Sequence, residues 1–175
     1  MRNATGGTGN DPLKINPNAT PELSRFAFLI GEFRCEAKVD PGNGVWVRLN
    51  ATWEGRFILD GYVIADDYRM TSAEGELLVL GTNFRCYDAQ KKRWNIKWLN
   101  ALAGNWVDLG SEELGGVHID ETGITYAMKE PMAAHLFTRA TYMNISENRF
   151  TWRGEKSDDG QRWEDFMVIE AYRIG

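Results

Sequence analysis

Asp66 is the acidic side chain of this sequence with the best spacing for acid or base chemistry. It alternates with Tyr62, Ile64, Tyr68 and Met70, which are large and at least partly apolar. Because successive side chains of a strand point to opposite faces, we predict that Asp66 faces inward with this row. Burial raises the pKa of a carboxyl group and suits it to general acid or base catalysis. The other carboxylates of predicted strands are expected to face solvent.

Arg85 is the basic side chain that we expect to meet Asp66. It lies between Asn83 and Tyr87 on one face of its predicted strand. A hairpin at residues 73–75 would make this strand the neighbour of the strand that carries Asp66. A buried arginine requires a partner, so the two side chains are predicted to form an ion pair. The alternative, in which Arg85 lies on the solvent-exposed outer surface, stays open at this point.

The two histidines complete the set of candidate catalytic residues. His135 precedes a predicted strand, where a neutral imidazole could move a proton at physiological pH. His118 and His135 form no close pair of the kind that zinc sites use, so no metal is expected. Motifs of covalent catalysis and of nucleotide binding are absent from the sequence, and no cofactor is expected. The candidates are therefore Asp66 and His135 as acid or base, with Arg85 and Tyr68 holding an oxyanion.

Aromatic residues make up 12% of the chain and include seven Trp. Trp both fills protein cores and lines ligand pockets. We predict that some of these side chains offer apolar surface to a ligand and that nearby polar side chains orient it. The predicted ligand-binding residues are Asn83, Trp94, Trp98, Asn100, Trp106, Arg139 and Trp152.

Strands must position these residues, and frequent turns indicate that the strands are many and short. Small, polar and Gly-rich clusters reverse the chain from residue 40 on, for example at 40–44, 60–61 and 157–160. On the order of ten strands fit between the turns, and a sheet of that many usually curls and closes. The predicted fold class is therefore all-β, an antiparallel up-and-down β-barrel.

One helix is predicted ahead of the strands. Pro21 suits its first position, and Leu23 and Phe26 belong to its single apolar face. We expect this short helix to cap one end of the barrel. Residues 1–20 have little to bury and are predicted to form a flexible N-terminal arm, while residues 21–175 form a single barrel domain.

Composition narrows the expected partners. A net charge of −5 would repel a phosphate backbone, so nucleic acid is not expected as a partner. The sequence contains no run of about 18 apolar residues, the length that a membrane-spanning helix requires. Its first residues also lack the apolar segment of a secretory signal, so a cytoplasmic location is expected. Cys35 and Cys86 are predicted to be reduced thiols within strands. Strands that are apolar on both faces leave a homodimer open.

Several short motifs occur in an order that is found in one family of barrels. Residues 28–33 (Phe-Leu-Ile-Gly-Glu-Phe) resemble the opening of lipocalin-like proteins, where an apolar helical turn leads into a Gly-x-aromatic strand start. With residues 53–62, 80–88, 92–94 and 171–173, they resemble the bacterial DUF1579 family of calycin-like β-barrels. The sequence has Phe33 where that family usually has Trp. The resemblance implies a barrel with an interior cavity, and it transfers no catalytic residue.

Three interpretations of function remain. In the first, the barrel binds a small apolar or aromatic molecule in its cavity. In the second, it is a cofactor-independent enzyme, an isomerase, cyclase or hydratase, that acts on such a molecule by acid and base chemistry. In the third, the barrel is filled solid, and its two-sided apolar strands form a dimer interface.

Overall fold

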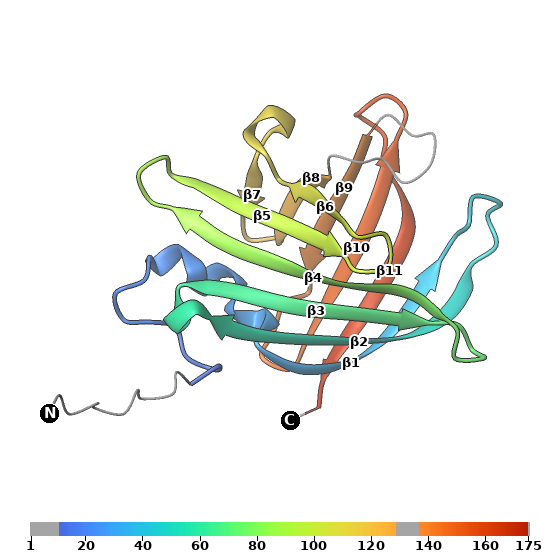
Figure 1. Ribbon diagram of the computed structural model, residues 1–175. Helices are drawn as coiled ribbons and strands as arrows, with labels where there is room; N and C mark the ends of the chain where they lie inside the picture. The colour runs from blue at the N-terminus through green and yellow to red at the C-terminus, as the bar shows by residue number, and fades with distance from the viewer. Residues whose placement is uncertain (1–10, 129–136, 175) are drawn as a thin grey trace, which may run out of the picture.

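The computed structural model describes residues 11–128 and 137–174, which form one β-sheet and three short 3₁₀-helices (Figure 1). In chain order the elements are η1 Pro21–Leu29, β1 Gly31–Val39, β2 Val47–Ile58, η2 Leu59–Gly61, β3 Val63–Thr71, β4 Leu77–Asp88, β5 Arg93–Asn100, β6 Asn105–Leu109, η3 Glu112–Leu114, β7 Val117–Ile119, β8 Ile124–Met128, β9 Phe137–Met143, β10 Arg149–Ser157 and β11 Glu164–Arg173.

The sheet closes on itself, as the number of predicted strands indicated. Its order is β6-β5-β4-β3-β2-β1-β11-β10-β9-β8-β7, all antiparallel, and a further pairing of β6 with β8 joins the two sides at Leu109 and Met128. Of these eleven strands, the three-residue β7 adds only to one edge of β8, and the other ten form the barrel. The predicted antiparallel up-and-down barrel of about ten strands is therefore confirmed.

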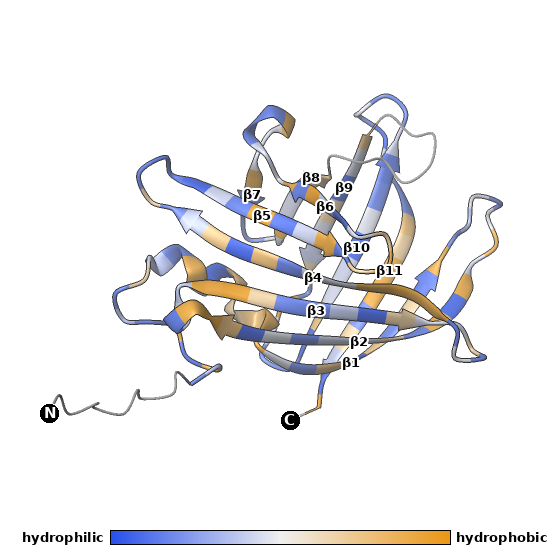
Figure 2. Ribbon diagram, in the orientation of Figure 1, coloured by the Kyte–Doolittle hydropathy of each residue, from blue (hydrophilic) through white to orange (hydrophobic). Residues whose placement is uncertain are grey.

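Alternating side chains explain why these segments are strands. In β1, Phe33, Cys35 and Ala37 are buried, whereas Arg34 and Glu36 between them are exposed. Figure 2 shows the same alternation as bands of hydrophobic and hydrophilic residues along the longer strands. The buried row of each strand faces the barrel interior, so the register of the sheet decides which side chains meet there.

Both cysteines are free thiols, in agreement with the prediction. Cys35 is buried on the inner face of β1, and burial raises the pKa of its thiol to about 12. Cys86 is partly exposed on β4.

Helix η1 closes one end of the barrel, but it is a 3₁₀-helix rather than an α-helix. Its buried residues Leu23, Phe26 and Leu29 recur at every third position. A 3₁₀-helix has three residues per turn, so this spacing puts all three on one face. The guanidinium of Arg173 on β11 donates to the carbonyl oxygens of Phe28 and Ile30, and so ties the end of η1 to the barrel wall.

Residues 11–20 are held against the β2–β3 turn. The amide of Phe57 donates to the carbonyl oxygen of Pro12 at 2.7 Å, and the amide of Asn16 donates to that of Gly61 at 3.1 Å. A Cβ atom at Gly61 would lie 2.5 Å from the backbone nitrogen of Asn16, so this approach requires glycine. Ten residues of the predicted flexible arm are therefore attached, and residues 1–10 lie outside the described part of the chain. No helix in the described ranges is both long and apolar enough to cross a membrane.

Candidate functional site

Asp66 and Arg85 form an ion pair inside the barrel, as the sequence predicted. Strands β3 and β4 are neighbours, and their register places Asp66 opposite Asn83 and Ile64 opposite Arg85. The guanidinium Nη1 of Arg85 contacts Oδ2 of Asp66, and both side chains are 0% exposed. Two opposite charges are therefore enclosed together in an otherwise mostly apolar interior.

Further donors surround the carboxylate of Asp66. The indole Nε1 of Trp53 and the amide Nδ2 of Asn83 each donate to Oδ1 of Asp66 at 2.9 Å. Two hydrogen-bond donors therefore contact one oxygen of this carboxyl group, and the guanidinium of Arg85 contacts the other. These contacts occupy both oxygens of the carboxyl group, whereas a general base requires a lone pair that faces its substrate.

Arg85 is enclosed on its other side by aromatic residues. Its Nη2 donates to the hydroxyl of Tyr142 at 2.8 Å, and the hydroxyl of Tyr126 lies 3.4 Å from that of Tyr142. The ring of Phe26 from η1 lies 5.1 Å from the guanidinium carbon. Burial raises the pKa of Tyr142 well above its ordinary value, so this hydroxyl stays neutral.

Sequence reasoning did not assign Trp53, Tyr126 or Tyr142 to the site. The alternation in their own strands was the available signal, because Tyr142 follows Thr138 and Ala140 on one face of β9, and all three are buried. That signal identifies a buried row, but it does not say which strand lies across the barrel.

Tyr68 is close to this polar cluster and takes no direct part in it. Its ring packs against Trp53 with ring centres 5.2 Å apart, and its hydroxyl donates to the sulfur of Met70 at 3.4 Å. Burial raises the pKa of Tyr68 far above its ordinary value, so it is a neutral hydroxyl.

Inward-facing side chains become partly exposed toward the end of the barrel opposite η1, which we call the open end. Trp98 is the register partner of Asn83, and Trp152 lies on β10, on the far side of the barrel. Both are only partly buried, although they face the interior. Seven partly buried apolar residues line this end: Val39, Leu49, Val79, Trp98, Val107, Met128 and Trp152.

Two glycines make room for the indoles at the open end. A Cβ atom at Gly81 would lie 2.4 Å from the ring of Trp98, and a Cβ atom at Gly154 would lie 2.8 Å from that of Trp152. The indole of Trp98 therefore lies against Gly81 on the neighbouring strand β4, and the indole of Trp152 lies against Gly154 on its own strand β10. The predicted ligand-binding residues Trp98 and Trp152 and the amide of Asn83 thus share one region.

Two other predicted ligand-binding residues have different surroundings. Trp94 is 8% exposed and lies beneath η1, with its ring centre 4.7 Å from that of Phe26. The side-chain oxygen of Asn100 accepts hydrogen bonds from the backbone amides of Leu102 and Ala103, both at 3.1 Å. Asn100 therefore shapes the β5–β6 turn, and Trp94 belongs to the packing between helix and barrel.

The prediction that Trp106 lines the cavity is wrong. Trp106 pairs with Leu99, points away from the interior and is 55% exposed. Its ring packs against that of Phe84 on the outer wall, with ring centres 5.7 Å apart. Strand β6 has only five residues, so its pattern alone did not indicate which face was inside.

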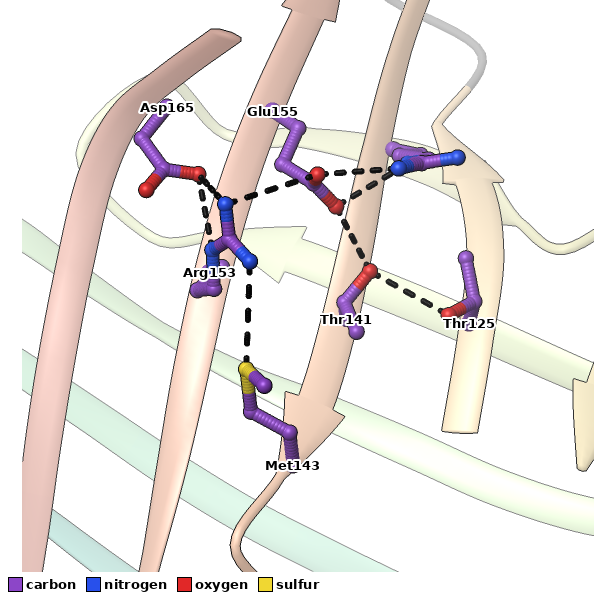
Figure 3. A network of polar contacts seen from close by, with 7 residues as sticks. Thr125, Thr141, Met143, Arg153, Glu155 and Asp165 are labelled. Atoms are coloured by element: carbon purple, nitrogen blue, oxygen red, sulfur yellow. Dashed lines mark hydrogen bonds and ion pairs between the residues drawn. The ribbon is translucent and has the colours of Figure 1, made fainter. Parts of the chain in front are cut away.

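Arg139 also faces outward, which contradicts its predicted place in the cavity. Its Nε and Nη2 donate to the two carboxylate oxygens of Glu155, both at 2.9 Å, and its guanidinium stacks over Trp163. Figure 3 shows the network around Glu155 on the outer wall, where Thr141 donates to the same carboxylate at 2.7 Å. Arg153 links the network to Asp165. The prediction relied on Phe137, which shares a face of β9 with Arg139, but Phe137 is also exposed. The smaller residues Thr138 and Ala140 form the buried row of this strand instead.

The histidines add no described catalytic group. His135 lies within residues 129–136, outside the described residues, and His118 is an exposed residue of β7. Within the described ranges, no group of three or more His, Cys, Asp or Glu side chains is arranged to hold a metal ion.

Two grooves lie on the surface at the η1 end, beside the β7–β8 turn. The larger has a volume of about 620 Å³ and includes Arg25, Lys92 and Trp94 in its lining, and the second shares Arg25. Neither is the enclosed interior cavity that the sequence analysis predicted. Close to η1 the interior is instead filled by aromatic rings, such as Phe26 against Trp94 and Tyr142.

The closed antiparallel barrel with its capping helix and filled inner end defines a calycin-like β-barrel. The crystal structure of Rv2717c from M. tuberculosis matches it with a TM-score of 0.60 and 10% sequence identity, over 90% of this chain and 100% of that one. At that identity the match shows a shared fold. No known protein family and no curated protein matches the sequence, so the resemblance to the DUF1579 family is unconfirmed.

Proposed function

We propose that this barrel binds a small apolar or aromatic molecule at its open end. The observation that carries the proposal is the partial exposure of Trp98 and Trp152, two inward-facing indoles on opposite walls, above a polar floor. Barrels of this size can hold one small ligand. A pocket lined by aromatic surface with a few fixed polar groups is the usual form of a small-molecule site.

The energetic argument rests on the remaining exposed area of the indoles. Covering apolar area contributes about 25 cal/mol per Å². Both indoles pack closely against glycines 81 and 154, and this packing limits the conformations that they can adopt. Binding therefore costs little side-chain entropy, which favours affinity.

The enzyme interpretation is less well supported by the same geometry. Asp66 was the leading candidate for a general acid or base, but Trp53, Asn83 and Arg85 all contact its carboxylate. A reaction at this carboxylate would have to break the ion pair first. A role in holding Asn83 and Arg85 in place fits these contacts better than proton transfer.

Binding of the neutral fluorescent dye N-phenyl-1-naphthylamine to the full chain tests the proposal. We expect saturable binding with increased fluorescence, and an affinity at least about tenfold lower for Trp98→Ala and Trp152→Ala. Trp106→Ala is the matched control, because this exposed indole on the outer wall should not affect binding. No saturable binding, or equal affinity in all three variants, would refute the proposal.

A further inference from the structure

The orientation of the Asn83 side chain determines which chemical group faces the open end. A carboxylate only accepts hydrogen bonds, so the contact of 2.9 Å between Asn83 and Asp66 fixes the amide nitrogen toward Asp66. The carbonyl oxygen of Asn83 then points the other way. Within the described part of the chain, no hydrogen bond to this oxygen is recorded, and Asn83 is 6% exposed. Because the amide nitrogen is engaged by Asp66, the group that Asn83 can offer to a ligand is this acceptor oxygen.

The positive charge of Arg85 is not available to a ligand in the open end. Its Nη1 contacts Asp66, its Nη2 donates to Tyr142, and the side chain is 0% exposed. Its Nε has no hydrogen-bond partner but is fully buried. Strand β4 runs from the open end toward η1, so a molecule that enters reaches Asn83 two residues before Arg85.

We propose that the site selects an uncharged aromatic molecule with an O–H or N–H donor and rejects a carboxylate of the same shape. This inference rests on the proposed function. A carboxylate beside Asn83 would bring its oxygens against a carbonyl oxygen, with the negative charge of Asp66 just behind it. Asn83 and Asp66 offer such an anion no donor, and burying an anion against acceptors is strongly disfavoured. A phenol or an indole instead donates to Asn83 while its ring packs between Trp98 and Trp152.

Displacement of N-phenyl-1-naphthylamine by three ligands of one shape tests this selectivity. At neutral pH, 4-ethylphenol is an uncharged donor, 4-ethylanisole has no donor, and 4-ethylbenzoate is an anion. We expect 4-ethylphenol to compete best, 4-ethylanisole to be at least about fivefold weaker, and 4-ethylbenzoate at least about tenfold weaker. Competition by the benzoate equal to or stronger than that of the phenol would overturn the inference.

The dye experiment keeps the two proposals apart. If the dye does not bind, the proposed function fails, whereas a bound dye with the wrong order of competitors contradicts only the selectivity.

In Asn83→Leu, the advantage of the phenol over the anisole should vanish. Asn95→Leu, a change at a partly exposed residue on the outer face of β5, should retain the full ratio. A ratio that survives in Asn83→Leu would contradict the assigned contact. If Asn83→Leu does not fold, the order of the three ligands with the unaltered chain still decides.

Discussion

The hydroxyl of Tyr142 accepts a hydrogen bond from Nη2 of Arg85 at 2.8 Å, across the barrel from β9 to β4. These strands are not neighbours in the sheet, so the bond crosses the interior instead of running along the wall. It joins the buried ion pair to the opposite side of the barrel. The charged cluster is therefore part of what fixes the shape of the interior.

Removal of this hydroxyl leaves a buried guanidinium donor without its acceptor. We expect Tyr142→Phe to lower the free energy of unfolding by about 1–3 kcal/mol, the usual cost of an unpaired buried polar group. Denaturant unfolding measures it. Tyr172→Phe on the outer wall is the control, and it should stay within about 0.5 kcal/mol of the unaltered protein. Equal effects of the two changes would contradict a special role for Tyr142.

Breaking the ion pair from one side should cost more than removing both charges. Arg85→Met leaves the carboxylate of Asp66 buried without its cation, and we expect a loss of about 3–5 kcal/mol. The double variant Asp66→Leu/Arg85→Met should recover part of that loss, since no buried charge remains. Arg56→Met removes a half-exposed partner of Asp67 and should cost no more than about 1 kcal/mol. A double variant less stable than Arg85→Met would show that the pair itself is strongly stabilising.

Glu155 on the outer wall predicts a pH dependence of stability. Burial alone would raise its pKa, but hydrogen bonds from Arg139 and Thr141 and the charges of Arg139 and Arg153 outweigh burial, so the pKa lies below 4.5. A lowered folded-state pKa gives stability that is present above the unfolded-state pKa and is lost as the pH falls through the folded-state value. Glu155→Gln should therefore be less stable by about 1–3 kcal/mol at neutral pH.

Unfolding measured at several pH values from neutral to about pH 3 checks this expectation. The difference between the unaltered protein and Glu155→Gln should shrink as the pH falls below about 4.5. Glu36→Gln, at an exposed carboxylate paired with Arg34, is the control and should show little difference at any pH. A difference for Glu155→Gln that stays constant with pH would mean that its charge does not stabilise the fold.

Gly81 should be required for the position of Trp98. A Cβ atom there would lie 2.3 Å from the carbonyl oxygen of Leu99 and 2.4 Å from the indole. We expect Gly81→Ala to cost about 1–3 kcal/mol in stability and to weaken dye binding, because the ring must move. Thr82→Ala, at the next position on the outer face, should leave dye affinity unchanged. Unaltered dye affinity in Gly81→Ala would show that the ring position is not needed for binding.

Alternation within long strands was enough to predict the central pair. Asp66 lies in a row of large side chains on β3, and Arg85 follows from the short hairpin that makes β3 and β4 neighbours. Both inferences need only the period of a strand and the sign of two charges. The same reasoning failed for Trp106 and Arg139, because a period of two gives two faces without saying which one is inside.

Contacts between distant strands were beyond sequence reasoning. Tyr142 and Arg85 are 57 positions apart, and only the closure of the barrel brings them together. The aromatic packing at the η1 end was also not predictable, because it depends on how η1 docks against the strands. The sequence predicted one enclosed cavity. The barrel instead has aromatic rings packed at the η1 end and the partly exposed indoles of Trp98 and Trp152 at the open end.

The most direct test of a ligand site at the open end is a nuclear magnetic resonance titration of the indole N–H groups with 4-ethylphenol. The seven Trp give seven signals, which single Trp→Phe variants assign. We predict saturable shifts for Trp98 and Trp152, and none for Trp46 or Trp106, which are exposed outside the barrel. Shifts confined to Trp94 would place the ligand in the groove beside η1 and would contradict the account.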